Sequence, residues 1–135
     1  MSEAQQTSSH TLLNSSQMAS FAARGFLRFD GIVPEALNQQ FLDEIGHVPI
    51  ESVEDPMKHY GKVMGTSAIP VIRPGTLLSD AYPADSAISD ILDLPMVSGV
   101  IQSLVGSSPT FDHHFLHITF PPHFYEGKQQ KSQHY

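Results

Sequence analysis

Apolar positions near the start of the chain predict a short helix after a polar tail. Residues 1–12 are mostly polar and offer little apolar surface to bury, so we expect a disordered tail. From Ser15 onward, Met18 lies at helical spacing from Phe21 and Ala22, and Gly25 follows as a stop signal. This pattern predicts an amphipathic helix over 15–25.

A strand and a second helix are predicted next. The segment GFLRFDG, residues 25–31, alternates apolar and polar positions between two glycines, which is typical of a strand that ends in a turn. In VPEALNQQFLDEIGHV, residues 33–48, Pro34 stands at a first-turn position and Gly46 ends an apolar stripe of helical period. We therefore predict a helix from about Pro34 to Gly46.

No sustained period is visible between Pro49 and Pro83, where prolines and glycines recur. We predict a long loop there, and such loops in compact domains are often functional. Lys62 and Arg73 are cations of this segment and are candidates for binding a carboxylate of a cofactor, although cations in loops are commonly solvated.

Two further helices are predicted around a proline. In SAISDILDLP, residues 86–95, a serine cap precedes apolar residues that share a helical face. Pro95 then starts PMVSGVIQSLVG, which ends at Gly106 as a C-terminal cap. The sequence predicts one helix that stops before Pro95 and another that begins there.

The segment FDHHFLHITF, residues 111–120, predicts a buried or half-buried strand. Successive side chains of a strand point to opposite faces. One face is predicted to carry Phe111, His113, Phe115, His117 and Thr119, and the other Asp112, His114, Leu116, Ile118 and Phe120.

Asp112 and His114 form an Asp-x-His pair, whose side chains a strand would place on one face. With a distant third ligand, such a pair suits a two-histidine, one-carboxylate iron site. The alternative is that Asp112 caps a turn and His114 is an ordinary hydrogen-bonded histidine. His113 and His117 have helical i, i+4 spacing, but the glutamate of a zinc-protease motif is absent between them.

Composition restricts the classes of function. The 135 residues carry a formal charge of −7 and no cysteine, and no cluster of Lys or Arg indicates a nucleic-acid or anionic membrane surface. Thiolate metal sites are excluded, so any ligands would be His, Asp, Glu or water. No secretory leader pattern or long apolar run is present, from which we expect a cytoplasmic protein with no membrane or nucleic-acid partner.

Three segments in order resemble the phytanoyl-CoA dioxygenase family of iron(II)- and 2-oxoglutarate-dependent oxygenases. They are GFLRFDGIVPEALNQQFLDEI (25–45), ILDLPMVSGVIQSLVGSSP (91–109) and FDHHFLHITFPP (111–122) with the polar loop that follows. The resemblance implies an α+β fold, in which amino-terminal helices precede the first strands of a double-stranded β-helix, or jelly roll. It makes residues 13–135 the amino-terminal part of such a domain.

The same resemblance implies Fe(II) and 2-oxoglutarate as cofactors and a small organic molecule as the hydroxylated substrate. In the family, iron is held by a His-x-Asp pair and a distant histidine, and an arginine holds 2-oxoglutarate. The His-x-Asp pair is expected after the loop that follows Pro122, and His134 is the nearest histidine, with no aspartate two residues later. We therefore expect an incomplete domain without activity of its own. Leu116 corresponds to a position that borders the cofactor, and ordinary core packing is the alternative.

Two other functions remain open. The first is a non-enzymatic interaction module that self-associates or pairs through the unpaired apolar strand at 111–120. The second is a small metal-binding protein built on the carboxy-terminal His and Asp residues.

Overall fold

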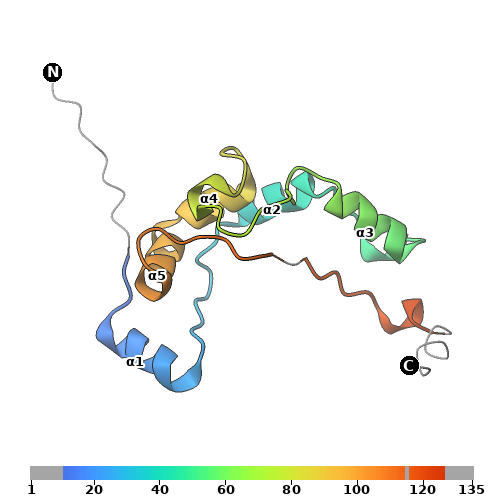
Figure 1. The fold of residues 1–135 in the computed structure, drawn as a ribbon. Coiled ribbons are helices and arrows are strands. Elements are labelled where there is room, and N and C mark those ends of the chain that lie inside the picture. Colours follow the sequence, from blue (N-terminus) through green and yellow to red (C-terminus); the bar gives the residue numbers. More distant parts are fainter. Residues whose placement is uncertain (1–10, 115, 127–135) are drawn as a thin grey trace, which may run out of the picture.

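The computed structural model describes residues 11–114 and 116–126, and these residues form a helical structure. The described residues form five α-helices. The helices are α1 (Ser15–Arg24), α2 (Glu35–Glu44), α3 (Pro56–Met64), α4 (Ala87–Asp93) and α5 (Pro95–Val105). Short 3-10 turns η1 (Ile50–Ser52), η2 (Leu78–Asp80) and η3 (Pro122–Phe124) lie between or after them. Figure 1 shows the extended carboxy-terminal segment running below α2 and α3.

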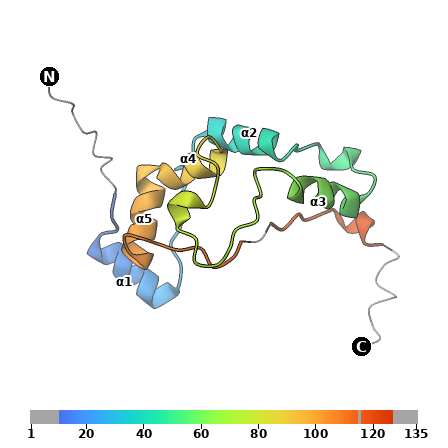
Figure 2. The same cartoon turned by 45° about the horizontal axis from the view of Figure 1, so that its top comes forward.

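The predicted α+β fold with the first strands of a jelly roll is wrong for the described residues. They contain no strand, and their β-pairing is limited to one isolated antiparallel bridge between Leu77 and Thr110. A jelly roll needs several extended segments hydrogen-bonded side by side. Within the described residues, no β-bridge joins the extended segments at 25–31 and 109–121, and neither forms a ladder (Figures 1 and 2 show their course).

The predicted helix at 15–25 is confirmed as α1, and both of its ends have a local cause. Asn14 accepts a hydrogen bond from the Gln17 N–H at 2.9 Å, and the Gln17 side chain accepts one from the Asn14 N–H at 2.9 Å. This reciprocal arrangement satisfies amides that a helix leaves unpaired at its start. Gly25 ends the helix in the left-handed conformation, with φ of 78°.

The predicted strand at 25–31 is wrong, although its alternation of side chains is kept. Leu27 and Phe29 are half-buried, whereas Arg28 and Asp30 are exposed and form an ion pair at 2.8 Å. Phe26 is 61% exposed. The pattern therefore describes an extended connection between α1 and α2, and a strand would also require a neighbouring segment with free backbone groups.

Helices α2 and α4 confirm the predicted helices at 34–46 and 86–95, and they pack together through a shared cap. Ser86 is the N-cap of α4 and is buried, and its hydroxyl accepts a hydrogen bond from the Ser89 N–H at 3.2 Å. The Glu44 carboxylate at the end of α2 accepts the Ala87 N–H at 2.9 Å. Because Ala87 is fully buried, this contact fixes the start of α4 against α2.

Helices α4 and α5 meet at an elbow of 70°. Leu94 ends α4, and Pro95 is the first residue of α5, where its missing N–H costs no hydrogen bond. The predicted restart at Pro95 and the end at Gly106 are confirmed. Among the described residues no single helix is long and apolar enough to cross a membrane, and only the bent pair α4 and α5 meets that length and composition together.

The predicted loop at 49–83 is partly wrong, because α3 lies inside it. Asp55 caps α3 by accepting the N–H groups of Met57 and Lys58 at 3.0 and 3.1 Å, and Pro56 occupies the first turn. Val63 of α3 is 1% exposed and is the largest fully buried side chain of the described core. The rest of that core is small and consists of Val53, Ala68, Ile69, Ala81, Ala87 and Phe120.

The chain just before α1 packs directly on α5. The Thr11 N–H donates to the Pro95 carbonyl at 3.1 Å, and the Leu13 N–H donates to the Ser103 hydroxyl at 2.9 Å. Gly99 is buried beneath this segment, and a Cβ atom there would overlap the carbonyl of Thr11. Residues 1–10 of the predicted tail lie outside the described residues.

Candidate functional site

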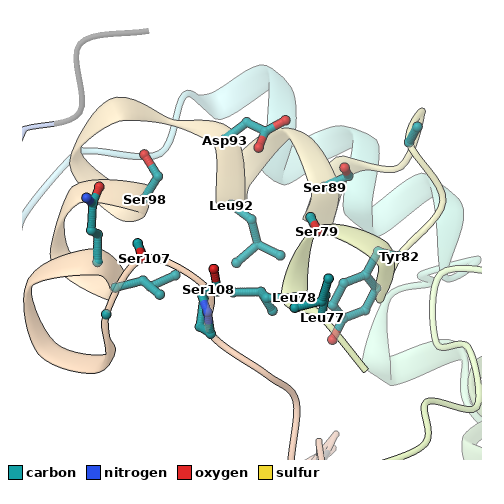
Figure 3. Close-up of a pocket in the computed structure, with 15 residues that line it drawn as sticks. Leu77, Leu78, Ser79, Tyr82, Ser89, Leu92, Asp93, Ser98, Ser107 and Ser108 are labelled. Carbon is teal, nitrogen blue, oxygen red and sulfur yellow. The ribbon is translucent and has the colours of Figure 1, made fainter. Parts of the chain in front are cut away.

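A cavity of about 470 Å³ lies between η2, α4, α5 and the turn that follows α5 (Figure 3). Leucine side chains and serine hydroxyls make up much of its lining. Its lining consists of Leu77, Leu78, Ser79, Tyr82, Ala84, Ser89, Leu92, Asp93, Ser98, Ile101, Gln102, Gly106, Ser107, Ser108 and Pro109. The volume is in the range of small-molecule sites.

The charge of this cavity does not suit 2-oxoglutarate. Asp93 is the one charged residue of its lining, and no Lys or Arg is present to hold a dicarboxylate. Ser98 directs its hydroxyl to the Leu94 carbonyl at 3.1 Å, so part of the polar rim already serves α5 itself. The remaining lining of hydroxyl, amide and leucine groups fits a neutral molecule better than an anion.

His114 belongs to an aromatic cluster at the edge of this cavity. Its Nδ1 lies 3.1 Å from the Tyr82 hydroxyl in a hydrogen bond, and its ring meets that of Phe111 edge to face at a centroid distance of 5.7 Å. Tyr82 and Phe111 are also in edge contact at 5.9 Å. Burial raises the pKa of the Tyr82 phenol, because the charged phenolate is poorly solvated there.

Asp112 is directed to a different partner. Its carboxylate lies 2.6 Å from His113 Nδ1, and its side chain is 85% exposed. The structure thus gives Asp112 and His114 separate contacts, and no group of three or more potential metal ligands assembles within residues 11–114 and 116–126. The described residues do not by themselves assemble an iron centre. The Asp112/His114 metal pair, which also needs a distant third ligand, stays a prediction.

The predicted cofactor-binding residues lie on three different segments. Lys62 is exposed in the last turn of α3, and Arg73 is exposed on the connection before the Leu77 bridge. Leu116 is half-buried on the extended segment. None of the three lines the cavity of Figure 3 or the second cavity described next, so their role in binding 2-oxoglutarate also stays a prediction.

A second cavity, of about 540 Å³, lies between the end of α2, η1, α3 and the extended segment. Its lining is mainly apolar and is formed by Ile45, His47, Val48, Ile50, His59, Val63, Ile118, Thr119, Phe120, Pro121 and Pro122. The His59 ring contacts Phe120 edge to face at a centroid distance of 6.4 Å. His47 and His59 are not among the site residues predicted from the sequence. The position of His59, one turn before Val63 on the same helical face, is the sequence feature from which His59 could have been predicted to face this cavity.

The described segment from Pro109 to Pro121 lacks a regular ladder, so the strand predicted at 111–120 is wrong as secondary structure. Its start pairs with the chain before η2, because the Phe111 N–H donates to Thr76 and its carbonyl accepts from Gly75, both at 2.7 Å. Burial alternates beyond that point. His114, Leu116 and Ile118 are half-buried and Phe120 is buried, whereas His113, His117 and Thr119 are exposed. The predicted two-faced pattern therefore holds for the described residues from His113 to Phe120 and fails at Phe111, which is half-buried, and Asp112, which is exposed.

Comparisons with known proteins identify no relative of this chain. No protein-family model matches it, and neither the curated proteins nor the solved structures include a significant match.

Proposed function

We propose that this chain is a pairing module whose helices present residues 109–120 for addition to a β-sheet formed with further polypeptide. We propose in addition that the sheet belongs to an iron(II)- and 2-oxoglutarate-dependent oxygenase of the phytanoyl-CoA dioxygenase kind, which hydroxylates a small organic substrate. One observation carries the first statement: an extended segment that is packed on one face and has a free backbone edge.

The free edge follows from the geometry of a strand. Backbone groups of successive residues in a strand point to opposite edges. Phe111 directs its N–H and C=O toward residues 75–76. The even-numbered residues point to the other edge, and their backbone groups form no hydrogen bond in the described part of the chain. These residues are Asp112, His114, Leu116 and Ile118.

Such an edge is a template for an incoming strand. Ile118 lines a cavity together with His59 and Val63 of α3, and Phe120 contacts the His59 ring, so the end of the segment is held next to α3 before a partner arrives. Preorganisation of this kind lowers the entropy cost of pairing. Exposed apolar residues elsewhere, including Phe26, Val71 and Val105, leave further surface that a partner can cover.

The oxygenase part of the proposal is supported by the order of the segments that resemble the family. Helices α2 and α5 occupy the corresponding segments, and the extended segment follows them in the same order. No group of three or more potential metal ligands assembles among the described residues, and neither described cavity is lined by Lys or Arg, so in this proposal the further polypeptide supplies most of the site for iron and 2-oxoglutarate. The contribution of this chain is then to position a sheet and not to perform chemistry.

The test combines the purified chain with a separate polypeptide that contains the iron-binding core of a phytanoyl-CoA dioxygenase-type enzyme without its own amino-terminal helices. Binding is measured by analytical ultracentrifugation, and succinate release is measured with Fe(II) and 2-oxoglutarate. We expect binding and iron-dependent succinate release from the mixture and none from this chain alone. Succinate release by this chain alone, or absence of binding, would contradict the proposal.

A matched pair of variants tests whether binding uses the free backbone edge. Leu116→Pro removes an N–H from the free edge, and Thr119→Pro removes one from the opposite edge. Neither N–H takes part in a hydrogen bond within the structure. We expect Leu116→Pro to weaken binding at least tenfold and Thr119→Pro to leave it nearly unchanged. Equal effects would show that the segment does not pair through this edge.

Self-pairing is a second candidate function, favoured by the composition of the same segment. Residues 113–120 contain no Asp, Glu, Lys or Arg, so two copies in antiparallel register meet without repulsion between fixed charges. A concentration-dependent dimer that Leu116→Pro abolishes and Thr119→Pro preserves would favour this candidate. A chain that stays monomeric in analytical ultracentrifugation up to about 100 µM would exclude this candidate.

A further inference from the structure

The second cavity, between α3 and the extended segment, has the composition of a binding site for a small apolar molecule. Ile45, Val48, Ile50, Val63 and Ile118 provide branched aliphatic walls, and Phe120 provides an aromatic one. The lining contains no Asp, Glu, Lys or Arg. A charged ligand would lose its hydration there without gaining a counter-charge, which is costly.

Two imidazoles and the Thr119 hydroxyl supply the polar side chains of the cavity. The ring nitrogens of His47 and His59 form no hydrogen bond within the structure, whereas His113 and His114 have partners. A neutral imidazole offers one donor and one acceptor. His59 is half-buried and is held by the edge contact with Phe120, so its position does not depend on a bound molecule.

We propose that this cavity binds a neutral, mainly apolar molecule that carries one hydrogen-bonding group, such as a hydroxyl or carbonyl, directed at His59. The volume of about 540 Å³ accommodates roughly 15 to 20 non-hydrogen atoms if each takes a share of about 30 Å³. Apolar walls with a few placed polar groups are the usual composition of small-molecule sites. The ligand contacts the side chains of Ile118 and Phe120 and leaves the free backbone edge of residues 112–118 accessible.

The site is independent of the oxygenase assignment. Its walls come from segments separated by about seventy positions, α2 and η1 on one side and residues 118–122 on the other. Figure 2 shows α3 above the carboxy-terminal part of the extended segment, with α2 and η1 leading into it. A bound molecule therefore joins the extended segment to α3, and binding is expected to order this end of the structure.

The test uses 2-naphthol and naphthalene, two probes that differ by a single hydroxyl. The chain has no tryptophan, so naphthol fluorescence is observed without interference from indole. We expect saturable 1:1 binding of both probes, with backbone amide NMR shifts concentrated at Val48, Ile50, Val63 and Ile118. Shifts concentrated instead at the cavity of Figure 3, or binding that does not saturate, would overturn the proposal.

His59→Phe keeps a ring against Phe120 and removes both nitrogens. We expect it to weaken 2-naphthol binding about three- to tenfold, which corresponds to one net hydrogen bond, and to leave naphthalene binding unchanged. His113→Phe, outside the cavity, should change neither. Unchanged 2-naphthol affinity in His59→Phe would refute the assigned contact. If that variant does not fold, His59→Leu, which also removes both ring nitrogens, takes its place, with the same expected result.

Discussion

The replacement Gly99→Ala should destabilise the chain although alanine is the better helix former. Gly99 lies in the interior of α5, where Gly→Ala alone adds roughly 0.5 to 1 kcal/mol of stability. A Cβ at this position would overlap the carbonyl of Thr11 and come within 2.9 Å of its nitrogen. Since backbone atoms cannot rotate away as a flexible side chain does, the segment before α1 has to leave α5.

The expected magnitude follows from the contacts that this movement breaks. The hydrogen bonds from Thr11 to Pro95 and from Leu13 to Ser103 are lost, each contributing about 1 kcal/mol net. After the gain in helix propensity is subtracted, Gly99→Ala should lower the free energy of unfolding by about 1 kcal/mol. Gly61→Ala in α3 is the matched control, because no atom lies within 4 Å of its Cβ, and it should raise stability by about 0.5 to 1 kcal/mol.

Thermal unfolding followed by circular dichroism measures both variants, and 1 kcal/mol corresponds to about 4 °C for a chain of this length. Native-state hydrogen exchange at Thr11 and Leu13 locates the effect. We expect loss of protection there in Gly99→Ala and native protection in Gly61→Ala. A Gly99→Ala variant as stable as Gly61→Ala, with both amides still protected, would refute the close packing of residues 11–13 on α5.

Two further predictions concern the α2–α4 contact and the aromatic cluster. Glu44→Ala should lower the free energy of unfolding by about 1 to 2 kcal/mol, because the buried Ala87 N–H loses its acceptor. Asp43→Ala, on the exposed side of α2, should change it by less than about 0.5 kcal/mol. Urea titrations measure both variants. Burial raises the pKa of Tyr82, so the neutral phenol contributes stability in full below the unfolded pKa of about 10, and this contribution is lost as the pH rises through the folded pKa. Tyr82→Phe should therefore lack this part of the decrease in melting temperature between pH 9 and 12. An identical decrease in both proteins would contradict the assignment.

Features that depend on neighbouring residues were predictable from the sequence. Pro95 and Gly106 mark the start and end of α5 because proline preorganises a first turn and glycine accepts the backbone conformation beyond a last one. Ser86 marks α4 for a similar reason. Helix α3 was missed, because Gly61 and Pro56 weaken the helical pattern, and its Asp55 cap carries the signal in their place.

Features that depend on distant residues were not predictable. Alternation at 25–31 and 113–120 correctly indicated which described side chains share a face. Strand formation also requires a partner segment of matching register, which a single sequence does not specify. The same applies to the candidate sites. His114 contacts Tyr82 and His59 contacts Phe120, and each pair joins positions more than thirty residues apart.

The contact of residues 11–13 with α5 has a consequence for insertions and deletions. Gly99 and Ser103 stand four residues apart, so they share one face of α5 and contact the same segment. One residue inserted between them would rotate Ser103 by about 100° and separate the two contacts. Related chains that dock in this way should vary freely in length before Thr11 and keep the interval between these two small residues.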